Sequence, residues 1–346
     1  MAVAGRTQRR KDRAMNSLER MWMAIKGSCK NPPVVIPYLQ YYFPEVVDEV
    51  TPYSRADLED GSFDHKVGAL SQLHEYFDCD WVRVTTDPPW ASRLYRQKAS
   101  GTSTPIIPAE QLLDEGIFDV AIELTRRFGE EKFIYGRVGI PYGVLFGDFS
   151  DIAGAMIALK TEPERCKKAM ENSIPQRLEE IRAWAEAGVH GLWLGQWLCS
   201  ADMISEADYL EFVHSYDQII VDAVQSAGLV AIYHFCGDVV PRLKHIKKTM
   251  PTIFGVEESK KGFDVDIARV RAGMGDDICL LGNIDVYDIV ERGSQEIWAS
   301  EVARQIRAGG PERFIVSCGS PITHDTPPQR LRDFVATAKE VRDRFE

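Results

Sequence analysis

The sequence predicts an α/β protein, a (β/α)8 TIM barrel with an N-terminal helical extension and small insertions. Eight short apolar runs alternate with helical patterns, and this alternation is typical of a parallel sheet. The last four strand–helix units are evenly spaced, and the chain of 346 residues is long enough for a full barrel. No Gly-x-Gly-x-x-Gly follows the first run, so a dinucleotide-binding fold has little support.

Each expected strand is an apolar run bounded by turn residues. The strands are expected at 34–38, 81–85, 133–138, 191–194, 229–233, 252–256, 278–281 and 314–317. Apolar residues at helical spacing predict the helices. These are expected at 17–26, 66–77, 109–128, 150–187, 205–227, 239–249, 265–272, 294–308 and 328–344, with a new helix beginning at Pro163. Residues 44–64 are expected to form an irregular acidic loop, and 91–107 a small hairpin insertion.

The barrel is predicted to be a single domain over residues 15–346. Residues 1–14 are basic and polar and lack the apolar stretch of a signal peptide. They are expected to be a disordered tail, or sequence upstream of a true start at Met15.

The composition narrows the classes of function. With 45% hydrophobic residues and a net charge of −11, the chain is expected to fold around a full core and not to have nucleic acid as its main partner. Its seven cysteines are an odd number spread thinly, which indicates a reducing compartment, so a cytoplasmic protein is expected. No apolar run reaches the length of a membrane span, and no membrane partner is expected.

Four potential metal ligands follow the ends of expected strands. His234 and Cys236 follow the run 229–233, and residues two apart on a strand share a face. Glu257 follows the sixth strand and Cys318 the eighth. Each residue alone would be interpreted as core. Because a barrel brings its strand ends to one face, their coincidence predicts a catalytic zinc site.

Zinc bound by two thiolates can hold a substrate thiol as its thiolate, or act as a Lewis acid on an ether or hydroxyl oxygen. Both roles suit the transfer of a methyl group. Glu257 is expected to be the ligand that is most easily displaced when substrate arrives.

Three motifs carry a family resemblance: His-x-Cys-Gly at 234–237, Gly-Asn-Ile-Asp at 282–285, and Ser-Cys-Gly-Ser-Pro-Ile at 317–322 with Thr-Pro-Pro at 326–328. They resemble the uroporphyrinogen decarboxylase-like superfamily, and more closely its zinc-dependent corrinoid methyltransferase branch. The resemblance implies a TIM barrel, a His-x-Cys…Cys zinc site at its mouth, and methyl exchange with the cobalt of a corrinoid protein. That protein is expected to be a separate partner, since this chain has no Asp-x-His-x-x-Gly cobalamin motif.

A second resemblance concerns the choice between Glu257 and Glu258. Residues 256–260 read Val-Glu-Glu-Ser-Lys and are similar to the Glu-Thr-Ser-Arg segment of cobalamin-independent methionine synthases, where the Glu is a zinc ligand. This similarity implies Glu257 as the ligand and leaves Glu258 as the alternative.

The sequence also departs from the family patterns. The decarboxylases carry an Arg-Gln-Ala-Gly-Arg segment after the first strand, which grips substrate carboxylates. Residues 37–42 read Pro-Tyr-Leu-Gln-Tyr-Tyr, without arginine, so decarboxylation is not favoured. Residues 195–197 read Gly-Gln-Trp where many of the methyltransferases have an Asp.

Aromatic residues gather at or beyond the expected strand ends. They are Tyr38, Tyr41, Trp90, Tyr142, Trp193 and Trp197. Each alone could be a bulky core or rim residue, but together they favour a flat aromatic substrate bound by stacking. Gln196, Asn283 and Asp285 are expected to orient that substrate, the last two as catalytic residues together with Glu257.

The leading hypothesis is a zinc-dependent O-demethylase for aryl methyl ethers, in which zinc polarises the ether oxygen while Co(I) of the corrinoid partner attacks the methyl carbon. A methylcorrinoid:thiol methyltransferase is the alternative within the class. A metal-free decarboxylase and a non-catalytic corrinoid-binding module are the rivals from other classes.

Overall fold

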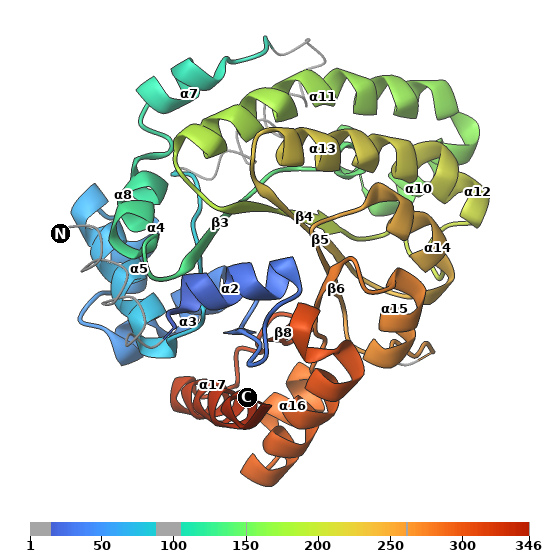
Figure 1. Ribbon diagram of the computed structural model, residues 1–346. Helices are drawn as coiled ribbons and strands as arrows, with labels where there is room; N and C mark the ends of the chain where they lie inside the picture. The colour runs from blue at the N-terminus through green and yellow to red at the C-terminus, as the bar shows by residue number, and fades with distance from the viewer. Residues whose placement is uncertain (1–14, 88–104, 150, 261, 346) are drawn as a thin grey trace, which may run out of the picture.

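The computed structural model describes residues 15–87, 105–149, 151–260 and 262–345. Its centre is a ring of parallel strands surrounded by helices (Figure 1). The eight strands of the described ranges run in the order β1-β8-β7-β6-β5-β4-β3-β2. They are β1 Val34–Val35, β2 Trp81–Arg83, β3 Phe133–Arg137, β4 Gly191–Gln196, β5 Val230–Phe235, β6 Ile253–Val256, β7 Cys279–Leu281 and β8 Phe314–Ser317. The fold is therefore the predicted (β/α)8 TIM barrel.

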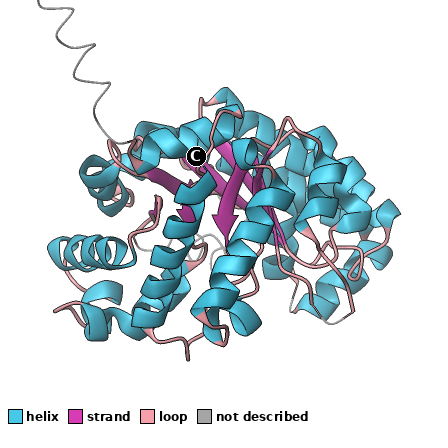
Figure 2. Ribbon diagram, turned by 60° about the horizontal axis from the view of Figure 1, so that its bottom comes forward, coloured by secondary structure: helices cyan, strands magenta, loops and turns pink. Residues whose placement is uncertain are grey.

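Helices cover the outside of the strands, as Figure 2 shows in a second view. The α-helices are α2 Ser17–Lys26, α3 Leu39–Val50, α4 Arg55–Glu59, α5 Phe63–Phe77, α7 Ala109–Asp114, α8 Asp119–Phe128, α9 Leu145–Asp148, α10 Ile152–Thr161, α11 Pro163–Glu186, α12 Glu206–Tyr209, α13 Ser215–Ser226, α14 Leu243–Ile246, α15 Ile267–Met274, α16 Gln295–Gly309 and α17 Pro328–Arg342. Short 3-10 or π segments are η1 Pro141–Val144, η2 Leu210–His214, η3 Val240–Arg242, η4 Lys247–Thr249, η5 Val286–Glu291, η6 Pro311–Arg313 and η7 Asp343–Phe345. The buried hydrophobic side chains form one continuous core.

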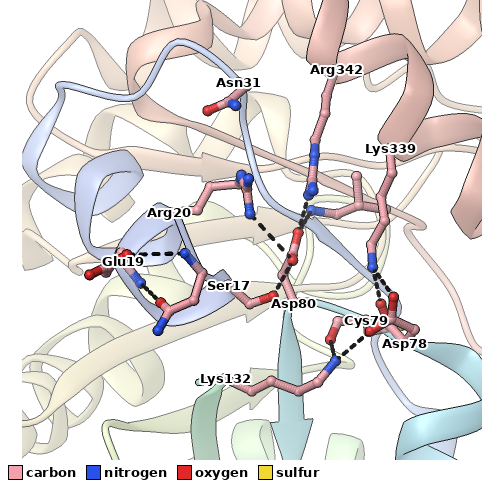
Figure 3. A network of polar contacts seen from close by, with 12 residues as sticks. Ser17, Glu19, Arg20, Asn31, Asp78, Cys79, Asp80, Lys132, Lys339 and Arg342 are labelled. Carbon is pink, nitrogen blue, oxygen red and sulfur yellow. Dashed lines mark hydrogen bonds and ion pairs between the residues drawn. The ribbon is translucent and has the colours of Figure 1, made fainter. Parts of the chain in front are cut away.

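Asp80 closes the barrel between β1 and β2 (Figure 3). Its backbone N–H donates to the Val34 carbonyl at 2.9 Å, and its carboxylate accepts from the Val34 N–H at 2.7 Å. The same buried carboxylate accepts from the Ser17 hydroxyl at 2.5 Å and from Arg342 of α17, and Arg20 of α2 lies 3.8 Å away. One acidic side chain thus joins the first strands to the first and last of the described α-helices.

Helix α2 lies across the N-terminal ends of the strands. The Leu18 N–H donates to the Glu131 carbonyl just before β3, and Arg313 just before β8 donates to the Ile25 carbonyl. The predicted N-terminal extension therefore covers the end of the barrel opposite to the strand ends where we expect the chemistry.

The prediction of an irregular loop over 44–64 was wrong. The structure has α3 and α4 there, even though Pro44 lies inside α3. An apolar stripe explains the helix, because Phe43 and Val47 are buried while the acidic residues face outward. Ser54 also begins α4 with a capping box.

Two other helical predictions need correction. The single helix expected over 109–128 is broken into α7 and α8 around Gly116, whose φ of 73° is open to glycine but costly for other residues. The helix expected over 239–249 is a series of short 3-10 and α turns. The helix start at Pro163 is confirmed. The region 205–227 is helical as predicted, with a π segment in the middle.

Two sequence predictions fall outside the described residues, the disordered tail at 1–14 and most of the hairpin insertion at 91–107. Within the described ranges, no single helix is long and apolar enough to cross a membrane. The bent pair Pro141–Asp148 and Ile152–Thr161 passes that test together, on length and composition only.

Candidate functional site

Residues of β5 alternate between the outer helices and the barrel interior. The Tyr233 hydroxyl donates to Asp217 of α13 at 2.5 Å and therefore points outward. The His234 ring points inward and stacks on Trp193 of β4, with centroids 4.9 Å apart. Alternation directs Cys236, just past the strand, to the same interior.

A cavity of about 670 Å³ lies at the C-terminal ends of the strands. This is the end where TIM barrels place their active sites. Its walls combine aromatic rings with two arginines, one thiol and one carboxylate. The lining residues are Tyr38, Tyr41, Arg83, Arg137, Gly143, Phe146, Gly147, Trp193, Gly195, Gln196, Trp197, Cys236, Glu257, Gly319 and Pro321.

His234 is at the centre of a small polar cluster beside this cavity. Its Nδ1 lies 3.0 Å from the Tyr38 hydroxyl and 3.8 Å from the Cys236 sulfur. Its other ring nitrogen, Nε2, is buried without a hydrogen-bond partner. Burial lowers the pKa of His234 to about 3, so the ring is neutral at physiological pH and keeps a lone pair for a ligand.

The Cys236 thiol is protonated in these surroundings. Burial, followed by the negative charge of Glu257, raises the pKa of Cys236 to about 12. A cation beside the sulfur would reverse this effect, because a positive charge favours the thiolate.

The structure distinguishes between Glu257 and Glu258. The Glu257 carboxylate lines the cavity and accepts from the Gly237 N–H at 2.9 Å and from the Ser320 hydroxyl at 3.2 Å. Lys260 lies 3.2 Å from the same carboxylate. Glu258 is buried and does not line the cavity. Of the two acids, Glu257 is the one that lines the cavity, and its role as a metal ligand stays a prediction.

Cys318 lies just behind the cavity wall. It forms a β-bridge with Ile284 beyond the end of β8 and is fully buried, while the next residue, Gly319, lines the cavity. Among the residues that the structure describes, no three His, Cys, Asp or Glu side chains are grouped so that they could hold a metal ion. The four-ligand zinc site stays a prediction.

Asn283 and Asp285, the other predicted catalytic residues, do not line the cavity. The Asn283 amide donates to the carbonyls of Val265 and Glu257 and accepts from Gln305, so all its polar atoms serve the fold. Asp285 caps η5 by accepting from the Asp288 N–H at 2.7 Å. A direct catalytic role for either residue stays a prediction that this geometry does not support.

The predicted substrate-binding residues fall into three groups. Trp193, Trp197, Gln196 and Tyr38 line the cavity. Tyr142 is buried behind the wall, where its hydroxyl donates to the Leu198 carbonyl at 3.1 Å. The remaining residue, Trp90, lies outside the described residues.

The Gln196 amide is held from behind. It donates to Asp217 at 2.6 Å and accepts from the Cys199 thiol at 3.3 Å. Asp217 is buried and also accepts from Tyr233. Burial raises the pKa of Asp217 to about 7. A titratable carboxyl therefore lies one hydrogen bond behind the cavity wall.

Sequence reasoning missed Arg83 and Arg137, which end β2 and β3 and line the cavity. A signal was present, because each is a charged residue on an otherwise apolar strand. Both share strand parity with Trp81 and Tyr135, whose rings contact Trp193 inside the barrel with centroids 6.1 and 5.9 Å away. That parity points both arginines inward.

The family assignment rests on a match over most of the barrel. A family model described as Uroporphyrinogen decarboxylase (URO-D) matches residues 110–341. The chain belongs to this family. The family of enzymes and the barrel fold thus agree with the resemblance drawn from the motifs.

Relatives within the URO-D family carry two kinds of name. A uroporphyrinogen decarboxylase of Trichodesmium erythraeum is 27% identical over 272 residues, covering 74% of this chain and 70% of that protein. A methylated-thiol–coenzyme M methyltransferase of Methanosarcina mazei is 25% identical over 219 residues. That match covers 63% of this chain but only 56% of the relative, just over half of its length.

A solved structure shares the whole fold. A methyltransferase from Methanosarcina mazei superposes with a TM-score of 0.75 at 18% identity, over 94% of this chain and 99% of that chain. At this identity the likeness confirms the barrel architecture and leaves activity to be argued from the site.

Proposed function

We propose that this protein is a methyltransferase that moves a methyl group between a small substrate and a corrinoid protein, as an O-demethylase of aryl methyl ethers. The observation that carries the proposal is the cavity with aromatic walls beside His234 and Cys236. The methyltransferase names among the relatives support the class of reaction.

The aromatic walls suit a flat substrate. Trp193 and Tyr38 meet edge to face with centroids 5.2 Å apart, and Phe146 contacts Trp197 at 5.0 Å. A benzene ring placed among them would replace water with aromatic contacts. In the proposed reaction the O–CH3 bond breaks, the methyl group passes to the cobalt of the corrinoid partner, and the aryloxide leaves and takes up a proton.

The side chains beside the cavity fit zinc by their chemistry. His234 has a buried ring nitrogen without a partner, Cys236 places its sulfur next to that ring, and Glu257 adds a carboxylate. By residue type these three side chains would be the ligands, with Cys318 as the predicted fourth, and binding would have to draw them closer together than they lie among the described residues. A bound Zn²⁺ would supply Lewis acidity next to an ether oxygen or a thiol sulfur.

The chain's own residues position the substrate and the ligands. The Tyr38 hydroxyl fixes the His234 ring, and the Gly237 N–H and Ser320 hydroxyl orient the Glu257 carboxylate. Burial raises the pKa of Tyr38 well above its ordinary value, so its hydroxyl stays neutral, and its oxygen can accept from Nδ1–H of His234 in the tautomer that leaves the lone pair on Nε2.

A thiol methyltransferase is the second candidate, and the methylated-thiol–coenzyme M methyltransferase among the relatives favours it. In that case the metal-activated group would be the thiol acceptor, and methyl transfer would run from the corrinoid to sulfur.

Metal content and methyl transfer with free cobalamin test the proposal. Protein prepared anaerobically would be analysed for zinc and incubated with cob(I)alamin and a panel of methoxyarenes, or with methylcobalamin and thiols. About one zinc per chain with ether-dependent methylcobalamin formation is the expected result.

Thiol-dependent loss of methylcobalamin would select the second candidate. Absence of zinc from the reduced protein, together with CO₂ release from an acidic tetrapyrrole, would replace both by a decarboxylase.

A further inference from the structure

Arg83 and Arg137 occupy neighbouring positions in the wall of the cavity. Their strands β2 and β3 are paired, and Arg83 is in register with Tyr135. Two positions before the arginines, the rings of Trp81 and Tyr135 meet inside the barrel with centroids 4.4 Å apart. Both guanidinium groups therefore extend into the cavity one layer above these rings.

Neither guanidinium has an anionic partner among the described residues. No hydrogen bond or ion pair joins the side chain of Arg83 or Arg137 to another described side chain, and Nε of Arg83 is buried without an acceptor. The segment 88–104, which follows β2 in the chain, contains no Asp or Glu in its sequence. Other described arginines, such as Arg177 and Arg342, form ion pairs with carboxylates.

The charge balance of the cavity is opposite to that of the whole protein. The chain has a net charge of −11, but the cavity is lined by two arginines and one acid. That acid, Glu257, already has Lys260 at 3.2 Å. Burial lowers the pKa of Arg83, and the nearby charge of Arg137 lowers it further. An anion bound between two such like charges would relieve both effects.

We propose that Arg83 and Arg137 form a carboxylate-binding subsite, so that the substrate is an aromatic acid. The inference rests on the function proposed above and names the substrate class of the same cavity. A guanidinium presents parallel N–H donors that match the two oxygens of a carboxylate. The neighbouring aromatic walls would hold the ring of the same molecule.

The order of the strands restricts the shape of this acid. Arg83 and Arg137 end β2 and β3, whereas Cys236 and Glu257 follow β5 and β6. Strand β4, with Trp193 in the wall, lies between the two pairs. A ring lying along this wall has its carboxylate at one end and its methoxy group at the other. This arrangement selects a 4-methoxybenzoate and rejects the 2-methoxy isomer, whose two groups point to the same end.

Binding of small acids to the full-length protein, without any corrinoid, tests this subsite. Titration calorimetry would compare 4-methoxybenzoate, 4-methoxybenzamide and 2-methoxybenzoate. The variants are Arg137→Gln, Arg83→Lys and the control Arg269→Gln, an exposed arginine on α15. Arg83→Lys keeps the positive charge, so weaker acid binding in this variant would not result from misfolding caused by the loss of a charge. Circular dichroism would verify the fold of each variant.

We expect 4-methoxybenzoate to bind the unaltered protein about tenfold or more tightly than the amide or the 2-methoxy isomer. Arg137→Gln should weaken 4-methoxybenzoate by about 10- to 100-fold, Arg83→Lys by less, and neither should change amide binding. Arg269→Gln should bind like the unaltered protein.

Equal binding of acid and amide, or unchanged acid binding in Arg137→Gln, would overturn the subsite. Tighter binding of 4-methoxybenzenesulfonate than of the carboxylate would overturn the carboxylate assignment. Selective acid binding without any methyl transfer to cobalamin would leave the subsite standing and remove the proposed function instead.

Discussion

The Tyr38 hydroxyl lies 3.0 Å from Nδ1 of His234, although 196 positions separate the two residues in the chain. The contact crosses the barrel from the loop after β1 to β5. It leaves Nε2 of His234 without a partner and fixes the ring against Trp193. The Tyr38 side chain, which lines the cavity, therefore orients His234, the predicted metal ligand.

Tyr38→Phe should reduce kcat/KM for methyl transfer by about five- to tenfold, because it removes this hydrogen bond but keeps the ring. The control is Tyr76→Phe, whose hydroxyl bonds Gln329 on the surface at 3.4 Å. The measurement is initial rates of methyl transfer with cobalamin. Equal rates for both variants would show that the hydroxyl does not position His234.

Cys236→Ala should lose most of the bound zinc and the methyl-transfer activity, since the thiolate is a principal donor of the proposed site. Cys166→Ala, a buried thiol on α11 away from the cavity, should keep both. Elemental analysis of the purified variants gives the answer. Full zinc and full activity in Cys236→Ala would contradict the zinc site.

Asp217 should make stability depend on pH. Its pKa is raised from 3.8 to about 7 by burial, so the folded protein holds this proton more tightly than the unfolded chain does. Its contribution to the free energy of unfolding should therefore fall as pH rises from about 4 to 7, by up to about 1.4 kcal/mol per pH unit.

Urea unfolding at several pH values would measure this effect as the difference between the unaltered protein and Asp217→Asn. Asp222→Asn, an exposed position on the same helix, serves as the control. Parallel stability curves for the unaltered protein and Asp217→Asn would show that Asp217 does not titrate in this range.

Asp80→Ala should lower the free energy of unfolding by about 3–5 kcal/mol, because it removes the buried carboxylate that pairs with Arg342 and leaves the Val34 N–H without its acceptor. The neighbouring Asp78 provides a matched control, since its ion pairs with Lys132 and Lys339 are on a side chain that is 65% exposed. Asp78→Ala should cost less than about 1 kcal/mol. Similar losses for both variants in urea unfolding would contradict the role of Asp80 in closing the barrel.

The sequence predicted the barrel well because strands buried on both faces read as continuous apolar runs. The fifth run ended on His234 and Cys236, and the structure places both beside the cavity. The prediction of a loop over residues 44–64 failed because the many acidic residues there obscured a narrow apolar stripe. The break in the helix at Gly116 was not predicted, because a single positive φ depends on packing that apolar periodicity does not record.

Side-chain partners were harder to predict than elements. Asn283 follows a strand as a catalytic residue would, yet its amide joins loops of the fold. The Gln196–Asp217 contact links residues 21 positions apart and required the packing of α13 on β4 and β5. Arg83 was hidden inside an expected strand, where a single basic residue is commonly read as an interruption of the pattern.

The backbone of Tyr38 has a φ of 62° and a ψ of 16°, a left-handed conformation that glycine adopts freely and tyrosine does not. Tyrosine at this position has two opposing effects, since its backbone conformation is costly whereas its side chain makes contacts at the site. Glycine would relieve the backbone at this position, but it would also remove the ring that packs against Trp193 and the hydroxyl beside His234. The costly backbone conformation is therefore tied to the same side chain that orients His234, the predicted metal ligand.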